Sequence, residues 1–117
     1  KDLRVRIFNY LASQILGVVL KINANADMKI LLIEDEERIA ALVVNGLEHA
    51  GFDVEVVCDG NEGLQAALSS QYDLILLDLI LPFMDGISLL QMVRSKDLRT
   101  PIIILKTLNV IFSKIGT

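Results

Sequence analysis

Three acidic side chains have the types and spacing for chemistry: Glu34, Asp35 and Asp78. Glu34 and Asp35 directly follow the apolar run 29–33, and Asp78 directly follows the apolar run 73–77. Nearly continuous Ile, Leu and Val is typical of buried parallel strands. Open parallel sheets bind ligands beyond the carboxyl ends of their strands. If the two strands are neighbours, we expect the three carboxylates to converge at that edge.

Converging carboxylates repel each other, so a fold does not gather them for stability. A divalent cation removes the repulsion, and Mg²⁺ suits such a site because it takes oxygen ligands together with phosphate oxygens. An Asp can also act as a nucleophile and accept a phosphoryl group as an acyl phosphate. The alternative is that residues 34–37 form only the solvated start of a helix, whereas Asp78 ends the most buried-looking strand.

Alternating strands and helices must position these side chains. We predict strands at 29–33, 53–57, 73–77 and 101–105, with a helix in each interval. Three features support the helices: one apolar face in each, Gly51 at a helix stop, and Asp59 with Glu62 as a capping box. The predicted apolar faces consist of Ile39, Val43, Leu47 and Ala50, then Leu64, Ala67 and Leu68, then Ile87, Leu90 and Val93 within a helix at 86–96. This order predicts a parallel sheet with helices on both faces.

Composition limits the other functions. The chain has 117 residues, 53 % of them hydrophobic and 22 % charged, with a net charge of −4, which indicates one ordered domain without a basic nucleic-acid surface. One Cys and one His exclude a disulfide framework and a multi-His metal site. We expect Cys58 to be partly buried and His49 to face solvent, not to form a catalytic pair. No phosphate-binding glycine loop occurs.

Residues 28–107 resemble the receiver domain of bacterial two-component response regulators, above all those that precede a winged-helix DNA-binding domain. The matching segments are MKILLIEDEE at 28–37, AGF at 50–52, DGNEG at 59–63, YDLILLDLILP at 72–82, MDG at 84–86 and PIIIL at 101–105. The resemblance implies a flavodoxin-like doubly wound sheet with strand order 2-1-3-4. Residues 1–27 and 108–117 lie outside the resemblance.

The resemblance also implies a role for single residues. Asp78 would be the phosphoacceptor of a two-component phosphorelay, and Mg²⁺ would be held by Glu34, Asp35, Asp78 and the backbone carbonyl of Ile80. The phosphodonor would be a sensor histidine kinase or a small acyl phosphate. The domain would be a cytoplasmic signalling domain and not an enzyme, apart from self-catalysed phosphoryl transfer and dephosphorylation. We expect neither direct contact with nucleic acid nor a membrane role for this segment.

The sequence departs from the receiver pattern at its end. The family ends its fourth strand with Thr or Ser, but Lys106 stands there and Thr107 comes one residue late, so both are doubtful phosphoryl contacts. The usual fourth helix, fifth strand and fifth helix are lacking, and no Lys-Pro pair follows. Lys114 is too close to strand four for a crossover helix. The sheet would therefore be incomplete, with an exposed apolar edge through which the chain could self-associate.

The first 27 residues allow two interpretations. Apolar residues at spacings of 3 and 4 favour an amphipathic helix that packs on the domain or a partner, namely Phe8, Leu11, Ile15, Val18 and Ile22. The alternative is an export signal, which the receiver resemblance disfavours.

Two other functions remain as alternatives. A degenerate receiver would serve only as a protein-interaction module, or would be a non-functional gene fragment. A phosphatase with an Asp nucleophile needs a second acid two residues later, where this chain has Ile80.

Overall fold

The computed structural model of the chain describes residues 5–6, 9–10, 12–13, 15, 17, 28–69, 71–78, 85–96 and 99–104. Its elements alternate along the chain as β1 (Lys29–Ile33), α2 (Glu37–His49), β2 (Asp53–Val57), α3 (Gly60–Leu68), β3 (Leu74–Leu77), α4 (Gly86–Lys96) and β4 (Ile102–Ile104). The predicted order of strands and helices is therefore confirmed. Among the described residues, no helix is long and apolar enough to cross a membrane.

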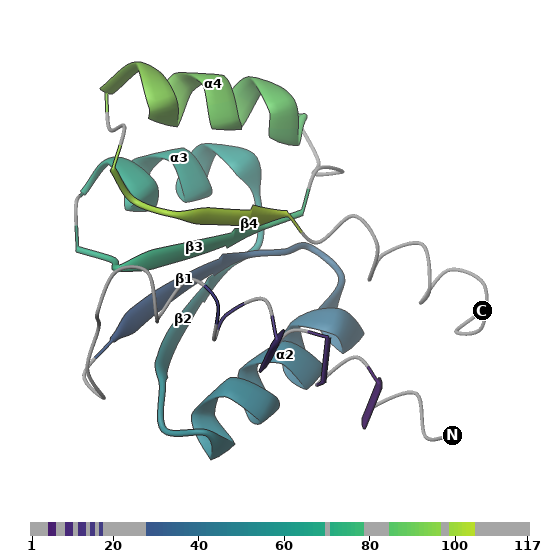
Figure 1. The fold of residues 1–117 in the computed structure, drawn as a ribbon. Helices are drawn as coiled ribbons and strands as arrows, with labels where there is room; N and C mark the ends of the chain where they lie inside the picture. Colours follow the sequence, from purple (N-terminus) through teal and green to yellow (C-terminus); the bar gives the residue numbers. More distant parts are fainter. Residues whose placement is uncertain are drawn as a thin grey trace.

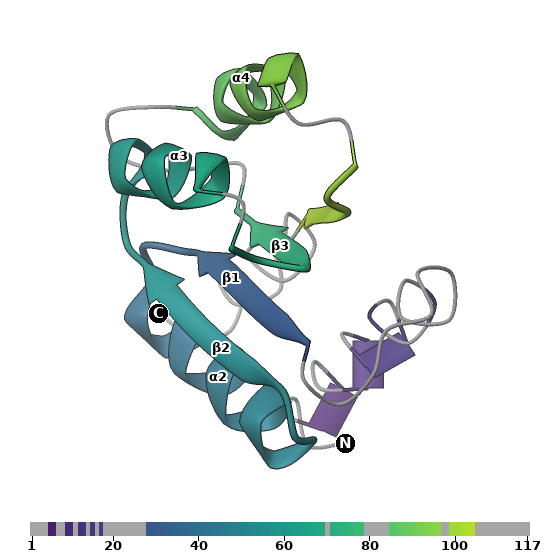
Figure 2. The ribbon, with the colours of Figure 1, turned by 90° about the vertical axis from the view of Figure 1, so that its left-hand side faces the viewer.

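The four strands form one parallel sheet in the order β2-β1-β3-β4. The helices α3 and α4 cover one side of the sheet, and α2 covers the other (Figure 1). Figure 2 shows these layers nearly end-on. The doubly wound arrangement expected from the sequence is thus confirmed for this part of the chain.

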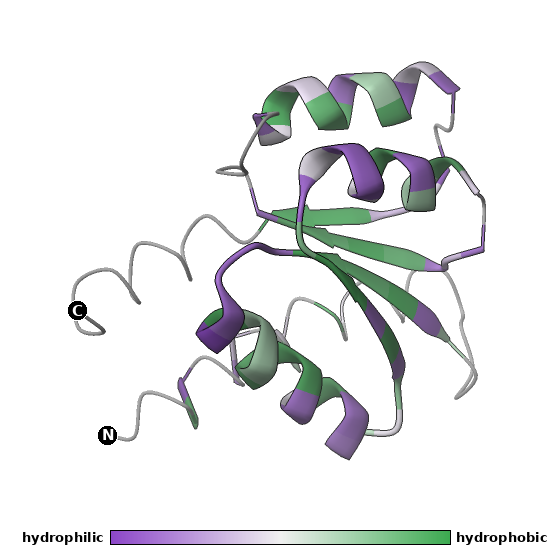
Figure 3. Cartoon of the chain, turned by 180° about the vertical axis from the view of Figure 1, so that it is seen from behind, coloured by the Kyte–Doolittle hydropathy of each residue, from purple (hydrophilic) through white to green (hydrophobic). Residues whose placement is uncertain are grey.

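Alternate residues of the strands face opposite layers, as the two-residue period of a strand requires. In β1, Ile30 and Leu32 belong to the core on the α2 side, whereas Leu31 and Ile33 belong to the core on the α3–α4 side. Because both faces are covered, all four side chains are buried, and β1 after Lys29 and β3 are hydrophobic, whereas the edge strand β2 carries the exposed Asp53 and Glu55 (Figure 3). The central strands can therefore carry a polar group only where they end.

Local signals set the ends of two helices. Asp59 accepts a hydrogen bond from the backbone N–H of Glu62 at 2.9 Å and so caps α3. After α2, Gly51 has a φ of +97°, and the N–H groups of Gly51 and Phe52 donate to the carbonyls of Glu48 and Leu47. This Schellman motif needs a left-handed residue, which glycine adopts without steric cost.

The apolar faces of two helices differ in part from the prediction. In α4 the buried residues are Gly86, Leu89 and Val93, and Ile87 is exposed, because several apolar residues left two helix faces possible. In α2, Ile39, Val43 and Leu47 are buried as predicted, but Ala50 is exposed because it is the C-cap residue. The helices exist as expected, but contact with the sheet decides which face is buried.

Candidate metal centre

Strand register brings Glu34 and Asp78 to the same level of the sheet. Ile33 of β1 pairs with Leu77 of β3, so the residues that follow them are neighbours. The backbone N–H of Asp78 donates to the carbonyl of Ile33 at 3.0 Å, and the N–H of Glu34 donates to the carbonyl of Val57 at 3.0 Å. The backbone of both acidic residues is therefore fixed by the sheet ladder.

The carboxylates of Glu34, Asp35 and Asp78 converge at this edge. One oxygen from each lies within 4.8 Å of the others. Glu34 and Asp78 are buried, with exposed fractions of 1 % and 0 %, whereas Asp35 is exposed. The cluster thus combines two buried carboxylates with one that faces solvent. A cation would enter the cluster from the solvent side, where Asp35 lies.

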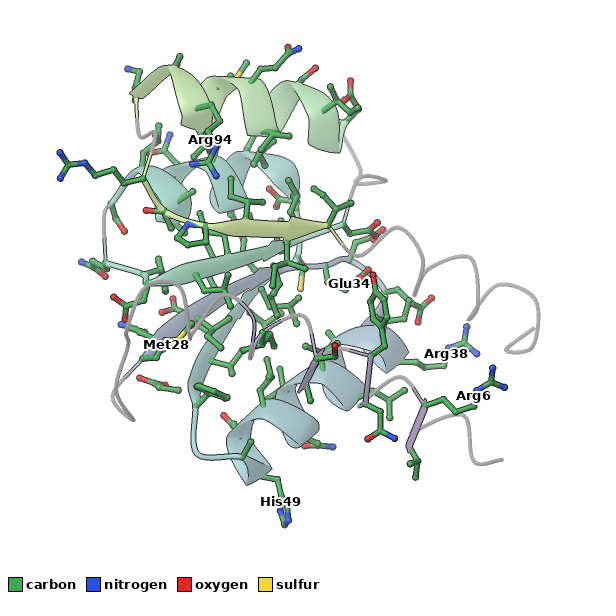
Figure 4. The ribbon with its side chains drawn as sticks, in the orientation of Figure 1. Arg6, Met28, Glu34, Arg38, His49 and Arg94 are labelled. Carbon is green, nitrogen blue, oxygen red and sulfur yellow. The ribbon has the colours of Figure 1, made fainter. Side chains whose placement is uncertain are left out.

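The start of α2 holds one oxygen of Glu34 and leaves the other without a partner. Glu34 Oε2 accepts from the N–H of Glu36 at 3.0 Å, and Glu36, the N-cap of α2, accepts from the N–H and Nε of Arg38. Figure 4 shows Glu34 beside the first turn of α2 and His49 at the opposite end of that helix. Glu34 Oε1 is buried and has no hydrogen-bond partner among the described residues.

The pKa of Glu34 is raised from 4.5 to about 9, and burial is the largest cause of this rise. The hydrogen bond from the Glu36 N–H acts in the opposite direction, and the interactions of Glu34 with the carboxyl groups of Asp78 and Asp35 contribute to the rise. Without a cation, Glu34 therefore holds a proton at neutral pH. A bound cation would displace that proton, because a carboxylate coordinates a metal in its ionised form.

These groups fit Mg²⁺. They supply three carboxylates with oxygens close enough for one ion, and no described residue is a hydrogen-bond partner for the buried Oε1 of Glu34, although a buried polar atom normally has one. Hard oxygen ligands and few protein carboxylates are what Mg²⁺ prefers. The fit thus rests on the donor set and on an unpartnered oxygen.

Other residues from the sequence prediction lie elsewhere. Ile80, Lys106 and Thr107 lie outside the described residues. The expectation that Cys58 is partly buried was wrong: Cys58 is exposed, because it follows the edge strand β2 at the open end of the sheet. His49 is exposed, as predicted, but ends α2 near the start of β2, so a full strand separates His49 from Cys58. The two cannot form a catalytic pair.

Sequence reasoning placed Glu36 only in an acidic helix start and missed that its N–H holds Glu34. The detectable signal was an acid at the N-cap position, directly before the apolar periodicity of α2.

A parallel sheet in the order 2-1-3-4, with helices on both sides and acids beyond its carboxyl ends, defines a flavodoxin-like α/β domain. In sheets of this kind, ligands generally bind at that edge. The family described as the response regulator receiver domain matches residues 30–113. This chain belongs to that family.

Individual proteins similar to this chain are also regulatory proteins. The response regulator ArlR of Staphylococcus saprophyticus is 42 % identical over 88 residues, which are 75 % of this chain and 40 % of the relative. The transcriptional regulatory protein HprR of Escherichia coli is 49 % identical over 78 residues, or 67 % of this chain and 34 % of the relative. The chain thus spans only about a third to two fifths of these curated relatives.

Solved structures show the same fold. A Francisella response regulator receiver domain has a TM-score of 0.63 and 37 % identity, covering 67 % of this chain and 64 % of that chain. The receiver domain of a sensor histidine kinase from Pseudomonas aeruginosa, with magnesium coordinated in its active-site cleft, has a TM-score of 0.64 and 34 % identity, covering 67 % and 66 %. About a third of each of these solved receivers is not covered by the match, so the described part of this chain, which ends at β4, forms an incomplete receiver fold, as predicted.

Proposed function

We propose that this chain is the phosphoacceptor module of a two-component phosphorelay, with Asp78 as the acceptor and Glu34, Asp35 and Asp78 as ligands of Mg²⁺. The single observation that carries the proposal is the convergence of these three carboxylates at the ligand-binding edge, two of them buried. We place the receiver segment at 28–107, with 1–27 and 108–117 outside it, although the family match extends to residue 113.

In the proposed reaction, a carboxylate oxygen of Asp78 attacks the phosphorus of the donor. A new O–P bond forms, and the bond from phosphorus to the leaving group breaks: P–N in a phosphohistidine, P–O in an acyl phosphate. The leaving group keeps that electron pair and takes a proton from solvent where it needs one. Asp78 is positioned by its backbone hydrogen bond to Ile33, and Glu34 by that from Glu36. When bound, Mg²⁺ would neutralise charge on the phosphoryl oxygens.

A histidine kinase is the proposed protein donor. A histidine kinase in complex with a response regulator is among the similar solved structures, with a TM-score of 0.62 and 30 % identity, covering 66 % of each chain. The further contacts proposed at the site are the carbonyl of Ile80 and the side chains of Lys106 and Thr107. Phosphorylation would act by shifting the populations of two conformations of the domain.

The test is incubation of the whole chain with Mg²⁺ and acetyl phosphate, followed by intact-mass measurement. We expect the mass of one added phosphoryl group on the wild type and on Asp53→Asn, whose exposed acid lies at the other end of β2. We expect no addition on Asp78→Asn. A folded wild-type chain that binds Mg²⁺ but gains no phosphoryl group would contradict the proposal and favour a degenerate receiver that acts only through protein contacts.

A further inference from the structure

The sheet face on the α2 side is wider than α2 alone covers. Its buried residues come from three strands, β1, β3 and β4, and the only described helix element of the receiver on this side is α2. In Figure 2, α2 lies below β1 and β2. The remaining apolar residues of this face lie toward the β3–β4 edge, and they are Leu74, Leu76 and Ile103, with exposed fractions of 0 %, 0 % and 8 %.

A residue from the start of the chain belongs to this same core. Ile15 is only 2 % exposed and clusters with the buried residues of β1, β3, β4 and α2, and Tyr10 packs against the cluster. Figures 1 and 2 together place this segment below the sheet, beside α2 and toward the β3–β4 edge. An element that precedes β1 in sequence thus lies against strands far along the chain.

The described residues of this segment are helical and have one buried side. Ile15 is buried and Tyr10 and Ala12 are half-buried, whereas Arg6 and Ser13 are exposed. Burial on one side only is what an amphipathic helix shows when it lies on an apolar surface. The interpretation of the first 27 residues as a helix that packs on the domain agrees with these positions; Phe8, Leu11, Val18 and Ile22 lie outside the described residues.

We propose that the helical residues described before β1, at 5–6, 9–10, 12–13, 15 and 17, belong to an N-terminal cover, an intramolecular occupant of the sheet face beside α2, and that this cover keeps the four-stranded domain folded and monomeric. The occupant is this segment of the same chain, because Ile15 is seated in the core that the face would otherwise expose. Undocking of the cover uncovers an apolar surface on β3 and β4, and such surfaces associate with other molecules. The inference is independent of phosphoryl transfer.

The direct test compares Ile15→Ala with Ser13→Ala in the full chain by denaturant unfolding. Ser13 is the matched control, because it lies two residues away in the same segment and is exposed. Removal of a buried Ile side chain leaves a cavity in the core. We expect Ile15→Ala to raise the ratio of unfolded to folded protein about tenfold or more and to lower the unfolding midpoint, with Ser13→Ala close to the wild type.

A second measurement separates a cover from a side chain that only adds stability. Ile15→Asp places a charge in the apolar contact, so the cover should undock, and light scattering should show concentration-dependent association. Val5→Asp, at an exposed position of the same segment, should stay monomeric.

If Ile15→Ala does not fold while Ser13→Ala does, the cover is required for folding, and the smaller change Ile15→Val then measures a graded loss of stability. Equal unfolding of Ile15→Ala and Ser13→Ala, or monomeric folded Ile15→Asp, would overturn the proposal.

Discussion

Both ends of the sheet carry acidic side chains, but the hydrogen-bond partners of these acids differ between the two ends. At the ends where the strands begin, Asp73 accepts from the N–H of Lys29 at 2.8 Å, and Tyr72 donates its hydroxyl to Glu55 at 2.7 Å. Lys29 Nζ also lies 5.3 Å from the centre of the Tyr72 ring. At the other end, Glu34 is buried with one oxygen that lacks a hydrogen-bond partner among the described residues.

The comparison separates acids that accept hydrogen bonds from the protein from Glu34, whose buried Oε1 has no hydrogen-bond partner among the described residues. A carboxylate with a local donor has its interaction supplied by the protein. A buried carboxylate oxygen without one costs stability unless something else supplies it. The amino ends of the strands are therefore a structural network, and the carboxyl ends are the candidate site.

The largest effect is expected in the pH dependence of stability without metal. The pKa of Glu34 is raised to about 9 in the folded chain from 4.5. The folded state therefore keeps a proton that the unfolded state loses between these values, so this group stabilises the fold fully below pH 4.5 and ceases to do so as the pH rises toward 9. The free energy of unfolding should fall with rising pH, by at most about 1.4 kcal/mol per pH unit.

Urea unfolding between pH 5 and pH 8.5 in a metal chelator measures this slope. Glu34→Gln, which is neutral at every pH, should lose most of the slope and be more stable than the wild type at the alkaline end. Asp73→Asn, at the opposite end of the sheet, should keep the slope. An equal slope in the wild type and in Glu34→Gln would show that Glu34 is not the group responsible.

A second effect is expected in Mg²⁺ affinity. Asp78→Asn removes one of the three negative charges of the cluster, and we expect Mg²⁺ affinity to fall about tenfold or more, since even indirect changes at metal sites cost this much. Asp73→Asn keeps a side-chain oxygen that can accept the hydrogen bond from the Lys29 N–H. Because residue 73 lies just before β3, at the end away from the cluster, the Mg²⁺ affinity of this variant should match that of the wild type. Calorimetric titration with Mg²⁺ measures both, and equal loss in the two variants would remove the distinction between the two ends.

The smallest effect is expected from Tyr72→Phe, which deletes only the hydroxyl that donates to Glu55. The variant should lower the free energy of unfolding by about 1 kcal/mol, the usual net value of one hydrogen bond. Mg²⁺ affinity should be unchanged, because Tyr72 precedes β3 and the cluster follows it. Denaturant unfolding and the same titration measure the two quantities, and a change in affinity would mean that the two ends are coupled.

Much of the fold could be predicted because its signals are local. The strands 29–33 and 53–57 and the helix 86–96 agree with the structure in both bounds, since apolar runs, caps and glycine stops act over a few residues. The exposed Ile87 and Cys58 were not predictable in this way. Which side of a helix or of a strand end is covered depends on the elements that pack there.

By itself, the sequence determined the alternation of strands and helices and the candidate acids at the strand ends, because period, caps and residue type are carried by neighbouring residues. Only the tertiary structure decided that Glu34 and Asp78, 44 residues apart in sequence, share one level of the sheet. It also decided that Glu34 is buried with one oxygen that no described residue partners, and that Ile15 lies in the core. Register and burial arise from contacts between distant segments, and no local pattern specifies them.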